Sequence, residues 1–346
     1  MKQIKLYMIH NSVHSIRDVF SYLKWENHFE NYEFIWDEKN PDYVISTEHI
    51  YLFNECRKKF KELYSKNRVQ IAVFSELYMP DFNLFDYSTG FYSEISCADR
   101  YVQFLTPDKF YKSFIDVNSK PIENIEQANE ELHNKKGFCN FLYSNPMAHP
   151  NRDAFFNKLS SYKKVDSLGK WLNNVGKTGT GFVGHANECI GIKSNYKFSI
   201  AFENATCKGY LTEKILTSLQ AHTIPIYWGD PEVTKFINPK CFINCHDYKS
   251  FDDVVEKVRE IDSDDEKWCE IVSQKWTTEQ NIINLNDRNK KYYDFWQNIF
   301  NQDLCNAKRV AMGTAPDSYI KWFHGKSDTF KFTTRLINKV RRIIKH

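Results

Sequence analysis

Apolar and polar positions alternate along the first hundred residues in the manner of strands followed by amphipathic helices. Four apolar stretches have strand length: residues 4–10, 32–36, 42–46 and 69–76. Two stretches between them, 15–25 and 52–66, repeat their apolar positions with helical spacing. Such alternation predicts a parallel sheet with helices on its faces. Ligands of these sheets bind beyond the carboxyl ends of the strands.

A second alternating set follows a polar stretch. Residues 115–136 carry little apolar pattern, and this loss predicts a domain boundary. The next strands and helices are predicted, among others, at 137–144, 152–162, 197–203, 211–222 and 223–229. We therefore predict an α/β protein with two Rossmann-like domains that face each other across a cleft. The predicted parts are an N-terminal domain (1–130), a C-terminal domain (131–305) and a basic tail (306–346).

The tail ends in a basic amphipathic segment. In residues 330–346, five aliphatic side chains fall on one helical face and Lys and Arg crowd the other. Such a helix at a terminus is typical of binding to an anionic membrane surface. Packing on the protein itself is the alternative.

Composition narrows the class of protein without identifying it. The chain has 346 residues, 42% of them hydrophobic, and a net charge of +3 that is too small to predict nucleic acid as a partner. Nine cysteines at irregular spacing do not indicate a disulfide framework, and Cys241 and Cys245 are interpreted as core thiols. No stretch has the pattern of a signal peptide or a membrane span, so a cytoplasmic location is expected.

The segment FENATCKGYLTEKILTSLQAHTIPIYWG, residues 202–229, carries the densest polar chemistry. An apolar strand runs into a polar turn and then into a helix, whose free N–H groups at its start favour phosphate. Lys214 adds a positive charge there, Glu213 can accept hydrogen bonds from ribose hydroxyls, and Asn204 and Tyr210 offer neutral donors. The alternative is an ordinary helix start, in which Glu213 favours the helix dipole.

Two further residues are candidates for chemistry. Arg152 opens a predicted helix after the loop YSNPMAHPN and can fork onto a diphosphate, although a surface arginine is the default alternative. Glu76 lies where a predicted buried strand ends in a loop that contains four aromatic residues (Tyr78, Phe82, Phe85 and Tyr87). Apolar walls around a carboxylate raise its pKa, which makes Glu76 a candidate general base.

The 202–229 segment closely resembles the signature of the α-1,3-fucosyltransferases of glycosyltransferase family 10. The resemblance includes YSNPMAHPNRDAFF (143–156) and FNLFDY (82–87), and it covers most of residues 70–250. It implies a GT-B fold, with the acceptor held by the N-terminal domain and GDP-fucose by the C-terminal domain. It implies Glu76 as the general base and Arg152 as the phosphate-binding arginine. It assigns the diphosphate and ribose to Asn204, Tyr210, Glu213 and Lys214.

The resemblance implies an inverting transfer of L-fucose from GDP-β-L-fucose to the 3-hydroxyl of GlcNAc in a surface glycan. Arg152 and Lys214 would neutralise the departing diphosphate, so no cofactor and no essential divalent metal is expected. An α-1,4 linkage or a glucose acceptor stays open, as does a non-catalytic GDP-sugar-binding module. The expected location is peripheral, on the inner face of the cytoplasmic membrane, through residues 330–346.

Overall fold

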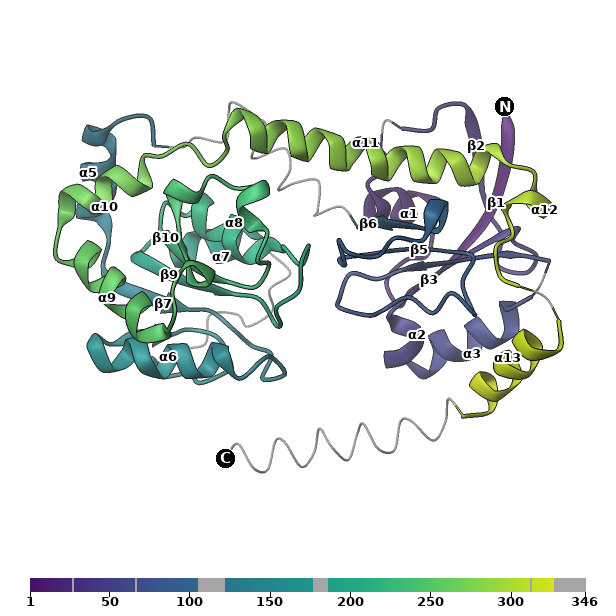
Figure 1. Cartoon of the computed structure of the whole chain (residues 1–346), viewed down its shortest axis with the longest axis horizontal. Helices are drawn as coiled ribbons and strands as arrows, with labels where there is room; N and C mark the ends of the chain where they lie inside the picture. Colours follow the sequence, from purple (N-terminus) through teal and green to yellow (C-terminus); the bar gives the residue numbers. More distant parts are fainter. Residues whose placement is uncertain (27, 66, 105–121, 177–185, 312, 327–346) are drawn as a thin grey trace. The chain divides into compact units, whose positions relative to one another are not determined.

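The computed structural model of the chain describes residues 1–346 except 27, 66, 105–121, 177–185, 312 and 327–346 (Figure 1). The chain divides into two compact units. The first unit comprises Met1–Gly90, Ile95–Phe104 and the chain from Tyr292 on, and the second comprises Phe91–Glu94 and Leu105–Lys291. Each unit is built on one parallel sheet, as the sequence predicts.

The sheet of the first unit has the strand order β2-β1-β3-β4-β5-β6, and every neighbouring pair is parallel. Its central strands β3 and β4 are buried at every position, because helices cover both faces of a parallel sheet. The strands are β1 (Lys2–Ile9), β2 (Tyr32–Trp36), β3 (Tyr43–Thr47), β4 (Val69–Val73), β5 (Tyr87–Gly90) and β6 (Tyr101–Gln103). The helices are α1 (Ile16–Leu23), α2 (His49–Leu52), α3 (Asn54–Leu63), α12 (Leu304–Ala307), α13 (Thr314–Lys326) and the second half of α11 (Glu279–Asn301).

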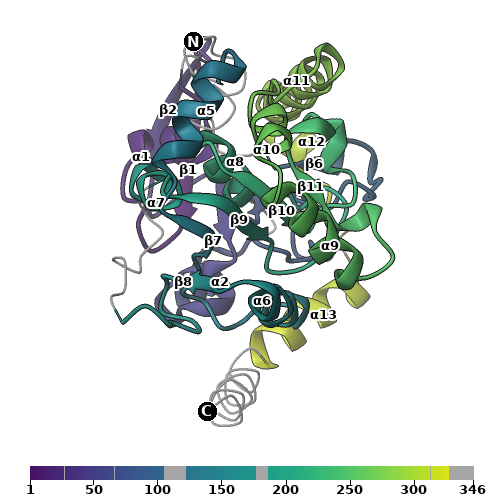
Figure 2. The same cartoon turned by 90° about the vertical axis from the view of Figure 1, so that its left-hand side faces the viewer.

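The second unit has the strand order β11-β10-β9-β7-β8, again all parallel. Its strands are β7 (Gly137–Phe141), β8 (Val165–Ser167), β9 (Tyr196–Phe202), β10 (Ile224–Trp228) and β11 (Ile243–Asn244). Its helices are α5 (Ile125–Asn134), α6 (Asn151–Tyr162), α7 (Ala186–Lys193), α8 (Glu213–Gln220), α9 (Phe251–Asp262), α10 (Asp265–Val272) and the first half of α11. Figure 2 faces this unit and shows its helices around the sheet.

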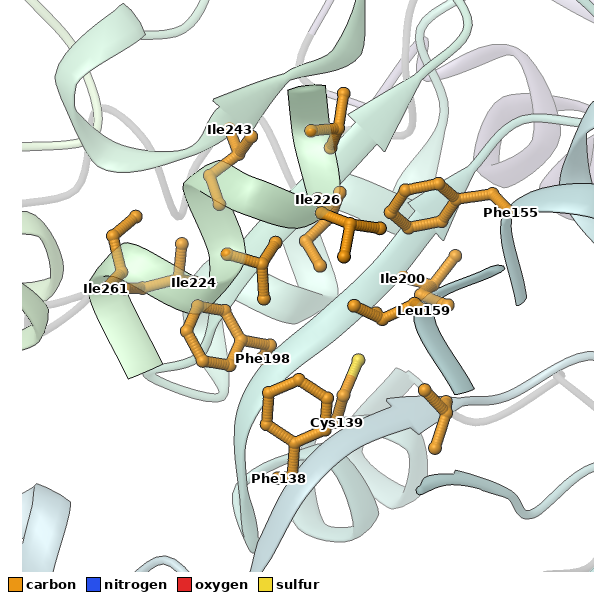
Figure 3. Packing of buried hydrophobic residues seen from close by; sticks show 14 of the residues in the cluster. Phe138, Cys139, Phe155, Leu159, Phe198, Ile200, Ile224, Ile226, Ile243 and Ile261 are labelled. Atoms are coloured by element: carbon orange, nitrogen blue, oxygen red, sulfur yellow. The ribbon is translucent and has the colours of Figure 1, made fainter. Parts of the chain in front are cut away.

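Alternate residues of β9 and β10 serve two hydrophobic clusters, one on each face of the second sheet. Phe198 and Ile200 pack with residues of α5, α6, α9 and α10, as Figure 3 shows for Phe155, Leu159 and Ile261. On the other face, Ala201 packs with α8 and Trp276. The period of two along each strand therefore makes this unit a three-layer sandwich.

The division between the units differs from the predicted boundaries at both ends. The polar stretch 115–136 contains α5, whose start is capped by the Asn124 side chain, and Ala128 of this helix is buried in the core of the second unit. At the other end, the Tyr292 hydroxyl donates to Leu23 O at 3.0 Å, and Trp296 packs on Trp25 with ring centroids 4.8 Å apart. Aromatic packing thus assigns the second half of α11 to the first unit.

The predicted tail begins inside the first unit. Ala307 is buried, and Arg309 N and Val310 N each donate to the buried Asp86 carboxylate at 2.7 Å. Tyr319 on α13 packs against the core formed by β3, β4 and α3. The amphipathic segment 330–346 lies outside the described residues. Among the helices that the structure describes, none combines the length and apolarity needed to span a bilayer.

Candidate active site

The segment that joins β9 to α8 begins with a buried carboxylate. Glu203 follows the buried end of β9 and is 0% exposed, and its N–H donates to Trp228 O at 2.8 Å. The turn that follows includes Gly209 at φ +92°, a backbone conformation that favours glycine. The helix α8 begins at Glu213 with Thr212 as its N-cap residue, as the predicted strand–turn–helix pattern requires.

Glu203 ties the turn to the helix start. Thr212 donates to its carboxylate twice, from N at 2.9 Å and from Oγ1 at 2.6 Å. Lys214 Nζ forms an ion pair with Glu203 Oε2 at 3.0 Å and contacts Glu213 Oε1 at 3.3 Å. A buried carboxylate requires such partners because its desolvation is otherwise very costly. Lys214, which the sequence analysis places near a bound anion, therefore bridges two carboxylates of the protein itself.

The charge on Lys214 is maintained by its neighbours. Burial opposes that charge, but the carboxylates of Glu203 and Glu213 outweigh it and raise the pKa of Lys214 well above its usual value. Lys193 is a second lysine that contacts α8. Its Nζ donates to Thr217 Oγ1 at 2.8 Å and to Ser218 Oγ at 3.0 Å. Burial lowers the pKa of Lys193 to about 8.

Arg152 is fully buried in the first turn of α6, so the surface alternative for it is wrong. Its guanidinium lies over the Tyr143 ring, with Cζ 4.5 Å from the ring centroid, and Nη1 donates to Asn204 Oδ1 at 3.5 Å. Its Nε makes no hydrogen bond to the described residues and lies 3.8 Å from Asp153 Oδ1. The arginine is thus fixed by stacking on Tyr143 and by a hydrogen bond from Nη2 to Asn145 O.

The structure therefore brings five of the predicted residues together in the second unit. Arg152 contacts Asn204, which directly follows Glu203, and Glu203 holds Lys214 beside Glu213. Tyr210 is 1% exposed, and its ring packs edge-on against Phe91 with centroids 4.8 Å apart. These contacts allow one patch to meet an anion with Arg152 and Lys214 and a diol with Glu213.

Glu76 belongs to the first unit, in the loop after β4, and it is exposed. The prediction that apolar side chains enclose this carboxylate is therefore wrong. Phe85 packs in the core on Phe60, and Tyr87 lies on β5 against Phe295, because FDYSTG contains a buried strand that the sequence pattern did not suggest. The position of Glu76 at a strand's carboxyl end is as predicted.

The residue before Glu76 is held by a second carboxylate that the sequence did not single out. Glu48 is 5% exposed and follows β3. It accepts from Ser75 Oγ at 2.6 Å and from Ser75 N at 3.2 Å. The Tyr22 hydroxyl in turn donates to Ser75 Oγ at 3.3 Å. This network fixes the backbone from which Glu76 projects.

The two cysteines that were interpreted as core thiols lie in the second unit. Cys241 and Cys245 are buried, and burial raises the pKa of both thiols, as expected of core cysteines. His246 lies 3.3 Å from Gly229 O through Nε2. In the part of the chain that the structure describes, no group of three or more His, Cys, Asp or Glu side chains could hold a metal ion.

Sequence reasoning missed Glu203, Glu48 and Lys193 as parts of these networks. Glu203 and Glu48 each end a stretch of buried positions, and Lys193 is itself buried. A charge in such a place requires a partner, and that requirement is the signal available in the sequence. The partner itself cannot be read from the sequence, because Glu48 and Ser75 come from different strand ends.

Two parallel α/β units with a candidate nucleotide-sugar site define a GT-B type fold. The family profile described as "Glycosyltransferase family 10 (fucosyltransferase) C-term" matches residues 132–320, more than half of the chain. The chain belongs to this family.

Relatives and solved structures agree with this assignment. An α-(1,3)-fucosyltransferase FucT of Helicobacter pylori is 35% identical over 225 residues, which cover 58% of this chain and 45% of that protein. The GDP-fucose protein O-fucosyltransferase 3 of Homo sapiens is 26% identical over 214 residues, covering 60% and 41%. A crystal structure of an α1,3-fucosyltransferase with GDP-fucose matches with a TM-score of 0.64 at 25% identity, covering 88% of this chain and 92% of that one. The chain spans less than half of the length of the curated relatives named here.

Proposed function

We propose that this protein is an inverting α-1,3-fucosyltransferase that moves L-fucose from GDP-β-L-fucose to the 3-hydroxyl of GlcNAc in a surface glycan. The observation that carries the proposal is the contact of the buried Arg152 on α6 with Asn204, next to the Glu203–Lys214 ion pair at the carboxyl end of β9. Support also comes from the relatives, since the solved structure named above was determined with GDP-fucose.

The second unit would bind the donor. Arg152 has a buried guanidinium whose Nε makes no hydrogen bond to the described residues, and Lys214 carries a stabilised charge, so both suit the developing charge on the diphosphate. Glu213, exposed to 34% at its side chain, would accept hydrogen bonds from the ribose hydroxyls, and Asn204 and Tyr210 would line the same region. With two fixed cations at this place, the transfer would need no divalent metal.

Glu76 would act as the general base. The acceptor hydroxyl oxygen forms a bond to the anomeric carbon, and the bond from that carbon to the diphosphate oxygen breaks, with its electron pair leaving on GDP. The hydroxyl proton passes to Glu76. A single in-line displacement inverts the configuration and gives an α-fucoside. Its transition state resembles the oxocarbenium ion of glycoside hydrolysis.

Other acceptors are compatible with the same donor site. An α-1,4 linkage or transfer to glucose changes only the acceptor hydroxyl. A protein hydroxyl is a further candidate because the human relative is named as a protein O-fucosyltransferase. A non-catalytic module that binds GDP-sugar is the alternative of a different class.

The first experiment is GDP release from GDP-fucose, with EDTA present, on four acceptors in parallel: Galβ1-4GlcNAc, Galβ1-3GlcNAc, lactose and a serine/threonine peptide. Release on the first alone is expected. Preference for the second, whose 3-position is occupied, would replace the α-1,3 linkage by α-1,4. Release that is lost in EDTA and restored by Mg²⁺ or Mn²⁺ would contradict the metal-free mechanism.

A Glu76→Gln variant tests the catalytic role. Loss of a general base typically lowers the rate by about 10²–10⁴-fold, so transfer should nearly vanish while GDP-fucose still binds. The matched control is Glu62→Gln, on the exposed surface of α3 in the same unit. Wild-type activity in Glu76→Gln would overturn the assignment. Donor binding by the wild type without any transfer would favour the binding module.

Residues 330–346 would hold the enzyme on the inner face of the cytoplasmic membrane. The support is the basic amphipathic pattern of that segment alone. Full-length protein should sediment with vesicles that contain an anionic lipid, and a chain ending at residue 329 should not. Transfer in solution should survive the truncation, and equal sedimentation of both chains would exclude this anchor.

A further inference from the structure

Three strand ends in the first unit meet at one edge of its sheet. The register aligns Ile9 of β1 with Ser46 of β3, and Ser46 with Ala72 of β4. The residues that follow these strands therefore share the carboxyl edge, where ligands of parallel sheets bind. They include His10 after β1, Glu48 and His49 after β3, and Ser75 and Glu76 after β4.

His10 and His49 form a stacked pair at this edge. Their ring centroids are 3.9 Å apart with an interplanar angle of 20°. His10 Nδ1 accepts from Ser12 N at 3.0 Å, and His49 Nδ1 accepts from Asn11 N at 3.1 Å. A neutral imidazole that accepts at Nδ1 carries its proton on Nε2. Both rings therefore present an Nε2–H donor, and among the described residues neither donor has a hydrogen-bond partner.

The surroundings of the pair keep it uncharged. Burial, together with His49 and His14, lowers the pKa of His10 to about 4, and burial lowers the pKa of His49. Both rings are half-buried, so they are fixed but reachable. A pair of fixed neutral donors suits the hydroxyl oxygens of a sugar better than an anion or a metal ion, which would require charge or free lone pairs.

The pair is connected to the loop that carries Glu76. The Tyr22 ring lies 4.9 Å from the His10 ring, and its hydroxyl reaches Ser75 Oγ, which Glu48 holds. On the other side, Phe53 is 41% exposed and packs edge-on against His49 with centroids 4.8 Å apart. Polar donors beside an apolar ring are the usual composition of a small-molecule site.

We propose that the stacked His10–His49 pair is an acceptor subsite, where the two Nε2–H groups donate to hydroxyl oxygens of the acceptor sugar beside Glu76. The proposal rests on the proposed function, because it takes the acceptor to be a neutral glycan. Its ligand class is a carbohydrate with neighbouring hydroxyls. In this subsite, the two imidazole donors would position the acceptor, and Glu76 would accept its proton.

The kinetic test replaces each imidazole by phenyl. His10→Phe and His49→Phe keep a stacked ring and delete the Nε2–H donor, together with the Nδ1 acceptor of Ser12 N or Asn11 N. Each should raise the acceptor KM by about three- to tenfold, the value of one neutral hydrogen bond. The KM for GDP-fucose should not change. His28→Phe is the matched control, since His28 is stacked on Tyr293 in the same unit with ring centroids 3.6 Å apart. An unchanged acceptor KM in both folded variants would overturn the subsite. So would a donor KM raised as much as the acceptor KM, because that pattern indicates a structural role.

Binding to the wild type keeps the proposal testable if the variants do not fold or if no acceptor reacts. Imidazole NMR signals of His10 and His49 are followed while Galβ1-4GlcNAc is added with GDP present. Shifts of both signals, with His28 unaffected, are expected. No shift with this disaccharide would overturn the subsite. Absence of GDP-fucose transfer together with these shifts would instead refute the proposed function and leave the sugar site standing.

Discussion

The two sheets of this protein carry different chemistry at their carboxyl edges. In the second unit, Glu203, Lys214 and Glu213 form a chain of charges that begins at the fully buried Glu203. In the first unit, the stacked His10–His49 pair is neutral and half-buried, and Glu76 is exposed. Parallel sheets offer the same kind of edge to both, so the difference lies in the side chains and not in the topology.

The difference matches what each edge would bind. A diphosphate carries charge, so its site must hold cations that are already desolvated and oriented. Hydroxyl groups are neutral, and donors without charge recognise them at lower desolvation cost. Charge pairing should thus dominate stability in the second unit and contribute little at the edge of the first.

Removing the charge of Lys214 from this chain should have the largest effect. Lys214→Met leaves Glu203, which is 0% exposed, without its cation, and breaking a buried pair typically costs about 3–5 kcal/mol. Urea unfolding followed by tryptophan fluorescence measures the loss. The double variant Glu203→Gln/Lys214→Met should recover most of it.

The control is Lys208→Met in the same unit. Lys208 pairs with Glu94 on the surface, where the two side chains are 44% and 68% exposed, and such pairs contribute less than about 1 kcal/mol. Equal losses in Lys214→Met and Lys208→Met would mean that burial does not distinguish the two pairs. The contrast between the two edges would then lose its support in the second unit, where the effect of charge is expected to be larger.

A smaller effect is expected from crowding the same carboxylate without altering charge. A Cβ on Gly229 would lie 2.3 Å from Glu203 Cγ and 2.9 Å from Tyr227 Oη. Gly229→Ala should therefore lower stability by about 1–3 kcal/mol, the usual cost of overpacking. Differential scanning calorimetry measures it.

The control for this change is Gly191→Ala on α7. Nothing lies within 4 Å of a Cβ at Gly191, and alanine in a helix should raise stability by about 0.5–1 kcal/mol. Opposite signs at the two glycines are expected. A melting temperature unchanged by Gly229→Ala would show that Glu203 can move, so the carboxylate would not be a fixed anchor.

The sequence predicted the strand–turn–helix unit at 202–229 and the parallel sheets because both have local periodic patterns. It did not predict β5, whose residues YSTG lack an apolar run although all four are buried. It also missed α5, because that helix buries Ala128 on an otherwise polar surface. Elements that bury few apolar side chains leave a weak signal in the sequence.

The candidate site shows the same limit. Asn204, Glu213 and Lys214 lie in one continuous segment, so their proximity followed from the sequence. Two other contacts join separate segments of the chain. They are the hydrogen bond from Arg152 to Asn204 and the hydrogen bond from Ser75 to Glu48. The exposure of Glu76 was mispredicted because Phe85 and Tyr87 turn into the core.

The finest test of the comparison is the titration of His10, which should change neither fold nor stability near neutral pH. His10 has a folded pKa of about 4 against an ordinary value of 6.5, so the unfolded chain binds more protons between these values. Stability should therefore rise with pH from about 4 to 6.5, and no contribution from His10 remains above that window. NMR of the His10 ring should give a midpoint near pH 4. The midpoint should move upward in His49→Asn, because that change removes both burial and a neighbouring imidazole. A midpoint near 6.5 in the wild type would show that the fold does not hold this imidazole neutral, and the contrast between the charge chain of the second unit and the neutral histidine pair of the first would be lost.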